Sequence, residues 1–308
     1  MDTVESTLCT LDRRIFRALK GTRLQHEYMS LNRRICRAIA STRRYAVNIP
    51  GCGTMYLNKV DLVNLYLYYY RTWEPGLSGI AAHALRSGDI FVDVGANIGY
   101  YTLLASNIVG AQGQVIAIEA SPSVFQTLEQ HVQINGRTNI QLFNIVATDV
   151  PGEMKIYKGP GDNVGTSSTL PGDRHQFEAQ VPALPLDTLL DGVDLSRVKC
   201  VKIDVEGGEY QVIAGMSKSI AALPAGVTVL LEVAVAHLRT LDYDLDRLLN
   251  PFTNQGFQLF RVENRYDEAF YAHFQSPTIT PCTLEDLASD VVVDLMLTRS
   301  DPRSRHLT

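Results

Sequence analysis

A strand, a glycine-containing turn and a helix follow one another over residues 90–106, and this segment constrains the fold most strongly. Residues 90–94 (IFVDV) are apolar and rich in β-branched side chains, which predicts a buried strand. The string GANIGYYTLLAS follows, and its later part is expected to be helical. Backbone amides at the start of such a helix have no partner within it, and glycines let a ligand approach the backbone closely. The segment therefore predicts a cofactor-binding turn.

Strands and helices alternate through the rest of the chain. Further strands are predicted over residues 115–118, 140–146, 200–204, 227–233, 257–262 and 291–297, and further helices over residues 125–135, 208–219 and 238–255. Strands separated by helices are typical of a doubly wound sheet, whose ligands bind at the carboxyl ends of the strands. We expect a Rossmann-like α/β fold with a mostly parallel seven-stranded sheet, the last two strands forming an antiparallel edge.

The glycine pattern and a nearby carboxylate indicate the type of cofactor. Residues 95–99 (GANIG) have the form G-x-N-x-G and lack the third glycine of the dinucleotide pattern. Glu119 ends the next strand, where a carboxylate can accept hydrogen bonds from both hydroxyls of a ribose. With Asp93 on the first strand, these residues resemble the S-adenosylmethionine site of Rossmann-like methyltransferases. The carboxylate of that cofactor favours donors at a helix N-terminus, here near Tyr100 and Thr102.

Longer stretches resemble one family of these enzymes. FVDVGANIGYYTLLAS, AIEASPSVFQTLEQHVQIN and VKIDVEGGEYQVIAGM are similar to the FkbM-type S-adenosylmethionine-dependent methyltransferases. The resemblance covers residues 73–235, and the pairing of D-V-G-A-N-x-G with K-I-D-V-E-G-x-E is highly specific. It implies a class I methyltransferase fold, S-adenosyl-L-methionine as cofactor, and O-methylation of a small-molecule hydroxyl, often on a polyketide, a sugar or another secondary metabolite.

The resemblance also implies which residues bind the cofactor. It places Asp93 and the turn at residues 95–99 around the methionine part, Glu119 on the ribose and residues 147–149 near the adenine. Glu74, in a Trp-Glu-Pro string, is expected either to reach the cofactor amine or to be a solvated carboxylate at a helix end. The full set of expected cofactor-binding residues is Glu74, Asp93, Gly95, Ala96, Asn97, Gly99, Tyr100, Thr102, Glu119, Ala120, Ser121, Ala147, Thr148 and Asp204.

Charged residues at the second motif are the catalytic candidates. Asp204 ends a buried strand, and strand alternation puts Lys202 on the same side, so the two are expected to pair. In the functional interpretation, Asp204 and Glu206 orient or deprotonate the acceptor hydroxyl while Lys202 tunes their charge. In the alternative, the Lys–Asp pair only fixes the turn. His237, just past the strand at residues 227–233, is a second candidate base.

Two segments flank the expected site. The polar loop at residues 158–175 is too long for a simple turn, so it either overhangs the acceptor site or is an ordinary surface excursion. Its candidate contacts are Asn163, Ser167 and Ser168. The aromatic helical segment at residues 60–88 is expected to be core or, in the alternative, a lid over the site.

The first fifty residues contain an arginine-rich repeat. Residues 11–23 (LDRRIFRALKGTR) and 31–43 (LNRRICRAIASTR) agree at eight of thirteen positions, with apolar residues at helical spacing. They predict two amphipathic helices, and we divide the chain into a basic helical extension, residues 1–50, and a methyltransferase domain, residues 51–308, with its core at residues 73–235. A basic amphipathic face suits a membrane surface or a partner. The alternative is a hairpin packed on the main domain or on a second subunit, as in a homodimer.

Charge and composition indicate where in the cell the protein is expected and what kind of partner it binds. The net charge of −5 divides into +6 for residues 1–50 and −11 for residues 51–308; the overall value gives no general reason to expect nucleic acid. The sequence shows neither a secretory signal nor a window of about 18 apolar residues, and its five cysteines are scattered. We therefore expect a cytoplasmic protein without a membrane span whose partner is a small molecule with a hydroxyl group.

Two alternative functions share parts of this pattern. An NAD(P)-dependent Rossmann oxidoreductase would have the strand, the turn and the ribose carboxylate, but it should show G-x-G-x-x-G. A non-catalytic Rossmann-like scaffold would instead act through its basic head on a membrane or a partner. A magnesium ion held by Asp204, Glu206 and Glu232 is not expected, because no cluster of ligands at metal-binding spacing demands it.

Overall fold

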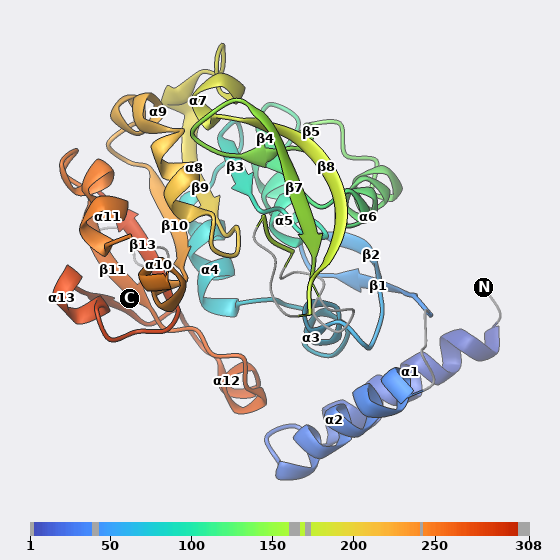
Figure 1. Ribbon diagram of the computed structural model, residues 1–308. Coiled ribbons are helices and arrows are strands. Elements are labelled where there is room, and N and C mark those ends of the chain that lie inside the picture. The colour runs from blue at the N-terminus through green and yellow to red at the C-terminus, as the bar shows by residue number, and fades with distance from the viewer. Residues whose placement is uncertain (1–2, 39–42, 160–166, 170–173, 241–242, 301–308) are drawn as a thin grey trace.

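An eight-stranded sheet forms the centre of the computed structural model, which describes residues 3–38, 43–159, 167–169, 174–240 and 243–300 (Figure 1). Its order is β12-β11-β13-β10-β9-β3-β4-β5. The strands are β3 (Ile90–Val94), β4 (Gln114–Ile118), β5 (Ile140–Phe143), β9 (Val198–Ile203), β10 (Thr228–Val233), β11 (Gln258–Val262), β12 (Ile279–Pro281) and β13 (Val293–Thr298). The seven predicted strands are present, and the short β12 adds an eighth at the edge.

The sheet is parallel from β10 through β9, β3 and β4 to β5, whereas β13 pairs antiparallel with both β10 and β11. The antiparallel edge is therefore confirmed. From β3 the chain runs outward through β4 and β5, and it returns to the other side of β3 with β9. This reversal between β3 and β9 is the point where open α/β sheets form a ligand-binding crevice.

Helices cover both faces of the sheet. They are α3 (Leu62–Tyr70), α4 (Pro75–Ala84), α5 (Tyr100–Val109), α6 (Pro122–Ile134), α7 (Leu186–Leu189), α8 (Glu209–Ala214), α9 (Ser217–Ala222), α10 (Val235–Thr240), α11 (Leu245–Thr253), α12 (Glu268–His273) and α13 (Leu284–Leu287). Alternation in β3 shows the two faces, because Phe91 packs in the core cluster with α3 to α6, and Val92 packs in the cluster with α8, α9 and α11. Burial on both sides explains why the parallel strands are continuously apolar.

Two predicted helices are divided in the structure. The helix expected over residues 208–219 consists of α8 and α9, and the one expected over residues 238–255 consists of α10 and α11. Gly215 lies at the first break, where an added Cβ would be 1.9 Å from the Thr148 carbonyl oxygen. The chain therefore bends where it passes close to another backbone segment, which periodicity within one segment does not reveal.

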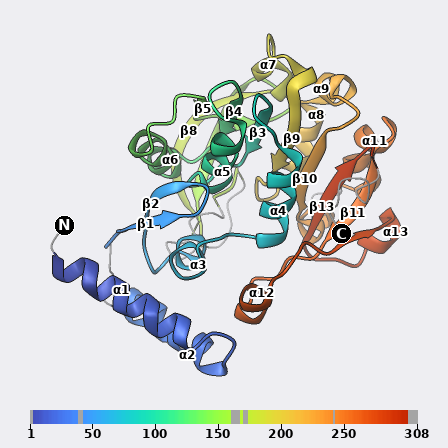
Figure 2. The same ribbon diagram turned by 180° about the vertical axis from the view of Figure 1, so that it is seen from behind.

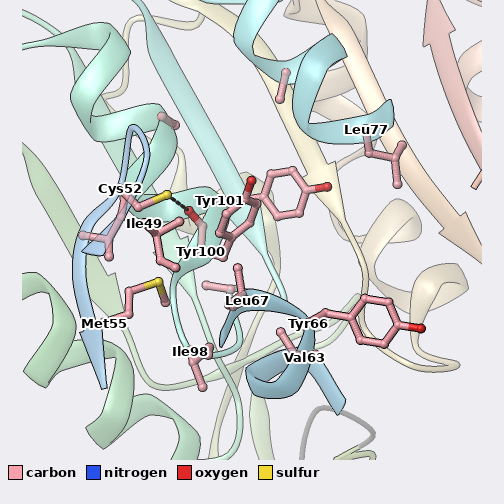
Figure 3. Packing of buried hydrophobic residues seen from close by; sticks show 14 of the residues in the cluster. Ile49, Cys52, Met55, Val63, Tyr66, Leu67, Leu77, Ile98, Tyr100 and Tyr101 are labelled. Carbon is pink, nitrogen blue, oxygen red and sulfur yellow. Dashed lines mark hydrogen bonds between the residues drawn. The ribbon is translucent and has the colours of Figure 1, made fainter. Parts of the chain in front are cut away.

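A small sheet and a β-hairpin were not predicted. The small sheet has the order β6-β8-β7, with β6 (Val146–Ala147), β7 (Gly152–Lys158) and β8 (Gln176–Leu184). The hairpin pairs β1 (Tyr45–Ile49) with β2 (Gly53–Leu57), so it crosses the predicted domain boundary at residue 50. Figure 3 shows it packed against the start of α5, where the Cys52 thiol lies 3.5 Å from the Tyr100 carbonyl oxygen.

The N-terminal repeat forms a helical hairpin of α1 (Thr3–Ala18) and α2 (Arg23–Ala38) at the outside of the molecule (Figure 2). The buried ring of Phe16 lies 4.4 Å from the ring of Tyr69 in α3. Two amphipathic helices and their packing on the main domain are present, but both helices begin eight residues before their copies of the repeat. Residues 19–22 of the first copy form the turn between the helices, and residues 39–42 of the second copy lie outside the described residues. Over the ranges that the structure describes, no helix is both long and apolar enough to cross a membrane.

Candidate functional site

A cavity of about 560 Å³ lies at the carboxyl ends of β3, β4, β9 and β10. Five carboxylate residues line it: Glu74, Glu119, Asp204, Glu206 and Glu232. Among the described residues, no lysine, arginine or histidine belongs to the lining. Apolar and aromatic side chains complete the wall, including Trp73, Ile118, Ala120, Ile145, Met154, Ile156, Tyr243 and Tyr266. The cavity therefore favours a ligand with positive charge and flat apolar surface.

The turn after β3 brings the backbone to the edge of the cavity. Gly95 has a φ of +84°, and a Cβ at this position would lie 1.7 Å from the Asp204 carbonyl oxygen. Only glycine fits such a close approach. Asn97 also has a positive φ, +50°, which is a strained conformation for a residue with a side chain. Backbone strain of this kind is concentrated at functional sites, and the strained Asn97 lines the cavity.

Glu119 is fixed at the end of β4 by two backbone amides. The Asn97 amide donates to Oε2 at 2.9 Å, and the Ser121 amide donates to Oε1 at 2.8 Å. Burial raises the pKa of Glu119 to about 7. Each carboxylate oxygen can accept a second hydrogen bond, so two adjacent hydroxyls of a ribose can be bound here.

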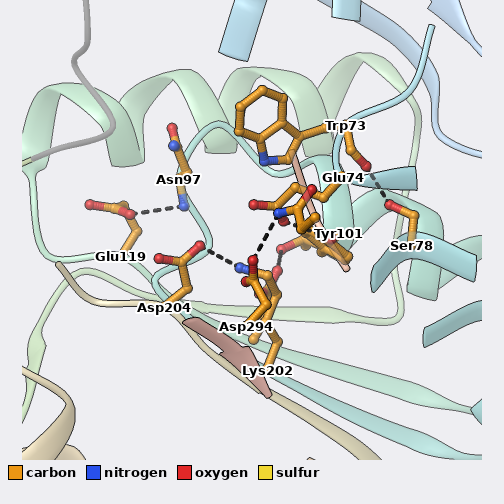
Figure 4. A network of polar contacts seen from close by, with 12 residues as sticks. Trp73, Glu74, Ser78, Asn97, Tyr101, Glu119, Lys202, Asp204 and Asp294 are labelled. Atoms are coloured by element: carbon orange, nitrogen blue, oxygen red, sulfur yellow. Dashed lines mark hydrogen bonds and ion pairs between the residues drawn. The ribbon is translucent and has the colours of Figure 1, made fainter. Parts of the chain in front are cut away.

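Glu74 is buried at the start of α4, with 1% of its surface exposed. The Tyr101 hydroxyl donates to its Oε2 at 2.8 Å (Figure 4). The Tyr266 hydroxyl donates to its Oε1 at 2.6 Å. Its own amide donates to the Tyr271 hydroxyl at 2.9 Å, and burial raises the pKa of its carboxyl group. The alternative of a solvated carboxylate at a helix end is therefore wrong.

The predicted pair at the end of β9 is present. Lys202 Nζ lies 2.6 Å from Asp204 Oδ2 and 4.7 Å from the centre of the Tyr101 ring (Figure 4). Asp204 lines the cavity, whereas Lys202 is buried behind it. Burial and the neighbouring Asp204 raise the pKa of Glu206 to about 8, and Glu206 has a positive φ of +52°. This edge of the cavity thus combines an ion-paired carboxylate with one whose pKa is near neutrality.

Asp93 supports the site from inside β3. Its side chain is buried, and Thr102 donates to its Oδ2 at 2.6 Å. Its Oδ1 accepts no hydrogen bond within the described ranges, and burial raises the pKa of the carboxyl group to about 6. Neither Asp93 nor Thr102 lines the cavity, so in this structure they join β3 to α5 behind the turn.

The expected site residues fall into two groups. Those that line the cavity are Glu74, Gly95, Asn97, Glu119, Ala120, Ala147, Thr148, Asp204 and Glu206. Those outside the lining are Asp93, Ala96, Gly99, Tyr100, Thr102, Ser121, Lys202 and His237. His237 packs over the turn, and a Cβ on Gly207 would lie 2.6 Å from its ring. Ser167 and Ser168 also line the cavity, whereas Asn163 lies outside the described residues.

Several lining residues were not expected from the sequence as cofactor or acceptor contacts. Tyr266 follows β11, and its ring stacks on that of Trp73 with centroids 5.1 Å apart. No local motif marks Tyr266, because it reaches the cavity from a distant part of the chain. Glu232 in β10 was considered only as a metal ligand, although its strand ends at the same edge of the sheet as Asp204. The strand-end rule alone would have identified it.

Carboxylate oxygens gather closely at this edge. Those of Asp204, Glu206 and Glu232 lie within 4.8 Å of one another, as do those of Glu74, Glu232 and Asp294. Burial raises the pKa of Asp294 to about 7 and that of Glu232 well above its ordinary value, with Asp204 adding to both effects. Either group has the geometry to hold a cation, and the expectation that no metal is used stays a prediction.

Comparisons with known proteins point to one family. The family model described as the Methyltransferase FkbM domain matches residues 93–259. Methyltransferase 1 of Beauveria bassiana is 27% identical over 144 residues, which cover 41% of this chain and 57% of that protein. A protein-L-isoaspartate O-methyltransferase of Methanococcus aeolicus is 30% identical over 101 residues, which cover 33% of this chain and 40% of that protein. The chain thus spans about half the length of these curated relatives.

Two solved structures are among those to which the chain is similar. Methyltransferase FkbM of Methylobacillus flagellatus aligns over 77% of this chain and 55% of its own chain, with 17% sequence identity and a TM-score of 0.42. Fibrillarin of Aeropyrum pernix, solved with bound S-adenosyl-L-methionine, aligns over 72% of both chains with 13% identity and a TM-score of 0.36.

Proposed function

The chain belongs to the FkbM methyltransferase family, whose domain model matches more than half of it, and on this premise we propose that it is an S-adenosylmethionine-dependent O-methyltransferase acting on a small-molecule hydroxyl. S-adenosylmethionine is the cofactor of this methyltransferase. We infer that the methyl group is transferred to an oxygen atom from the chemistry of the residues around the cavity. The oxidoreductase alternative is set aside, because the matched family transfers methyl groups.

The cavity fits the cofactor at three places. At Gly95 the backbone leaves no room for a side chain, which keeps the turn close to the ligand. The Glu119 carboxylate faces the cavity with accepting capacity left for ribose hydroxyls, and the neighbouring walls of Ala120 and Met154 suit an adenine ring. Glu74 offers a carboxylate for the amino group. When bound, the sulfonium supplies an electrophilic methyl group to the acceptor oxygen.

Asp204 and Glu206, which follow β9, have different roles toward the acceptor hydroxyl. Asp204 is positioned by its ion pair with Lys202, so its carboxylate accepts a hydrogen bond from the acceptor hydroxyl and orients it. Glu206 receives the hydroxyl proton at a carboxylate oxygen, because its pKa of about 8 is suited to proton transfer near neutral pH. Holding the acceptor oxygen, the methyl carbon and the sulfur in one line accelerates the transfer further.

One observation carries the proposal: the Glu206 carboxylate lines the cavity beside Asp204, and one oxygen of each lies within 4.8 Å of the other. A carboxylate in this position, with its pKa raised to about 8, can take up a proton from an acceptor hydroxyl in the cavity. The aromatic rings of Trp73, Tyr243 and Tyr266 in the wall support an acceptor with flat apolar surface, such as a sugar or a polyketide.

The test separates cofactor binding from methyl transfer. Calorimetric titration with S-adenosylhomocysteine measures binding, and labelled methyl donor with a panel of sugars, polyketides and phenols measures transfer, with the methylated atom located by NMR. We expect Glu206→Gln to lower kcat by about 10²-fold or more with unchanged binding of S-adenosylhomocysteine. The matched variant Glu119→Gln should weaken binding by about 10-fold or more. Transfer to nitrogen or carbon, or full kcat in Glu206→Gln, would contradict the proposal.

A further inference from the structure

The arginine-rich repeat has an exposed face that the methyltransferase site does not use. We call it the outer face, and it consists of Leu11, Arg14, Ile15, Leu31, Arg34 and Ile35. Its four aliphatic side chains are 52%, 39%, 54% and 51% exposed, in the order of the sequence. These residues occupy equivalent positions in the two copies of the repeat, so both copies present the same pattern of Leu, Arg and Ile to the surroundings.

The opposite side of the hairpin is fixed to the main domain. Asp12 accepts hydrogen bonds from the hydroxyls of Tyr28 at 2.6 Å and of Tyr68 at 3.0 Å, and it forms an ion pair with Lys59. The ring of Phe16 packs on α3, and the Arg33 guanidinium donates to the Val60 carbonyl oxygen at 3.1 Å. The inner side is therefore occupied by the protein itself, which holds the outer face in a fixed direction.

Each helix of the hairpin carries one pair of exposed aliphatic side chains. Leu11 and Ile15 lie one turn apart in α1, and Leu31 and Ile35 lie one turn apart in α2. Arg14 and Arg34 are exposed next to these pairs. The outer face thus combines aliphatic and cationic side chains in the same way on both helices.

We propose that the outer face binds the surface of a membrane that contains anionic lipids. Leu and Ile suit insertion at the boundary between headgroups and acyl chains, while the arginines beside them suit anionic headgroups. A nucleic acid would use the arginines but would leave the aliphatic side chains without a role. A second copy would place arginines of the same sign opposite one another, which is unfavourable.

The charge of the whole chain supports the same orientation. Residues 1–50 carry a net charge of +6, whereas residues 51–308 carry −11. An anionic surface therefore attracts the helical hairpin and repels the main domain, so the molecule binds with the outer face toward the lipid. This inference does not depend on methyl transfer, and it can be tested without cofactor or acceptor.

The experiment is cosedimentation of the full chain with vesicles at 0.15 M salt. Phosphatidylcholine vesicles with about 30% phosphatidylserine are compared with pure phosphatidylcholine, and we expect at least about 10-fold stronger partitioning to the anionic vesicles. Leu31→Glu with Ile35→Glu, and separately Arg14→Glu with Arg34→Glu, should each reduce that partitioning by about 10-fold or more. Raising the salt to 0.5 M should weaken binding by the wild-type chain, because screening acts on its electrostatic part.

Matched controls change exposed valines far from the hairpin. Val150→Glu with Val291→Glu alters side chains that are 64% and 68% exposed, and it should leave partitioning unchanged. Circular dichroism and thermal melting check that every variant is folded. Equal binding to both vesicle types, wild-type binding by the Leu31→Glu, Ile35→Glu variant, or a dimer in light scattering that this variant dissociates would overturn the proposal.

Discussion

Lys202 Nζ and Asp204 Oδ2 lie 2.6 Å apart at the carboxyl end of β9, with the ammonium group buried beneath the cavity. The described residues that line this cavity include five carboxylates and no basic side chain. The Lys202 ammonium therefore compensates part of the negative charge of these carboxylates. Asp204, Glu74 and Asp93 raise the pKa of Lys202 above its usual range despite its burial.

Removal of the ammonium should destabilise the protein. Lys202→Met keeps most of the side-chain volume but leaves Asp204 without its partner, and breaking a buried ion pair in this way costs about 3–5 kcal/mol. Denaturant unfolding measures this loss. The double variant Lys202→Met, Asp204→Asn should recover part of it, because the unpaired charge is then absent. Wild-type stability in the single variant would show that the pair contributes nothing.

The pH profile of catalysis should report the protonation of Glu206. A base acts in its ionised form, and the pKa of Glu206 is raised to about 8 by burial and by Asp204. We expect kcat/KM to rise with pH, with an apparent pKa of about 8, and to become constant above it. In Glu206→Gln the remaining activity should lose this rise. Steady-state rates between pH 6 and about 10 make the comparison, and an unchanged profile in the variant would assign the ionisation to another group.

Gly95 should be far more sensitive to substitution than another glycine with the same backbone conformation. Gly95→Ala places a Cβ 1.7 Å from the Asp204 carbonyl oxygen, so β3 and β9 must separate at the cavity. Gly88→Ala is the matched control, because Gly88 has a φ of +89° with no atom within 4 Å of the added Cβ. We expect loss of S-adenosylhomocysteine binding in Gly95→Ala alone, and a cost of about 1 kcal/mol in the control.

Without ligand, the protein should lose stability as the pH rises from about 4 to above 7. Burial raises the folded-state pKa of Asp294 and of Glu119 to about 7, so the folded protein retains protons that the unfolded chain releases near pH 4. The stability that these groups contribute is complete below that pH and is lost as the pH rises through about 7, with a slope of up to about 1.4 kcal/mol per pH unit for each proton.

Denaturant midpoints between pH 4 and about 8 measure this dependence. Asp294→Asn should flatten it, because one of the retained protons is removed. Asp286→Asn is the control, since hydrogen bonds with Thr283 lower the pKa of Asp286, so that above about pH 5 its proton is lost in both states and it adds nothing to the slope through pH 7. An equal slope in wild type and Asp294→Asn would show that Asp294 is ionised in the folded protein.

The part of the site that can be predicted from the sequence is carried by local backbone geometry. Gly95 and Glu119 follow directly from a buried strand, a turn and the next strand, so their positions depend on short segments with a strong pattern. Lys202 and Asp204 follow from strand alternation in the same way. Thr102 and Ser121 were expected to contact the cofactor, but they lie behind the cavity, where they bind Asp93 and cap α6. Motif position alone does not reveal which way these side chains turn.

The doubly wound sheet, the turn at Gly95 and the basic hairpin follow from the amino-acid sequence, because each depends on periodicity and on contacts between residues that are near in the chain. The set of carboxylates that meet at the cavity follows from the folded chain, because they come from distant segments. Tyr266 donates a hydrogen bond to Glu74, which lies 192 positions away in the chain. The Lys202 ammonium interacts electrostatically with Asp204, Glu74 and Asp93, which come from three different segments. The burial of each carboxylate and the charges around it depend on residues from distant segments, which come together only when the chain folds.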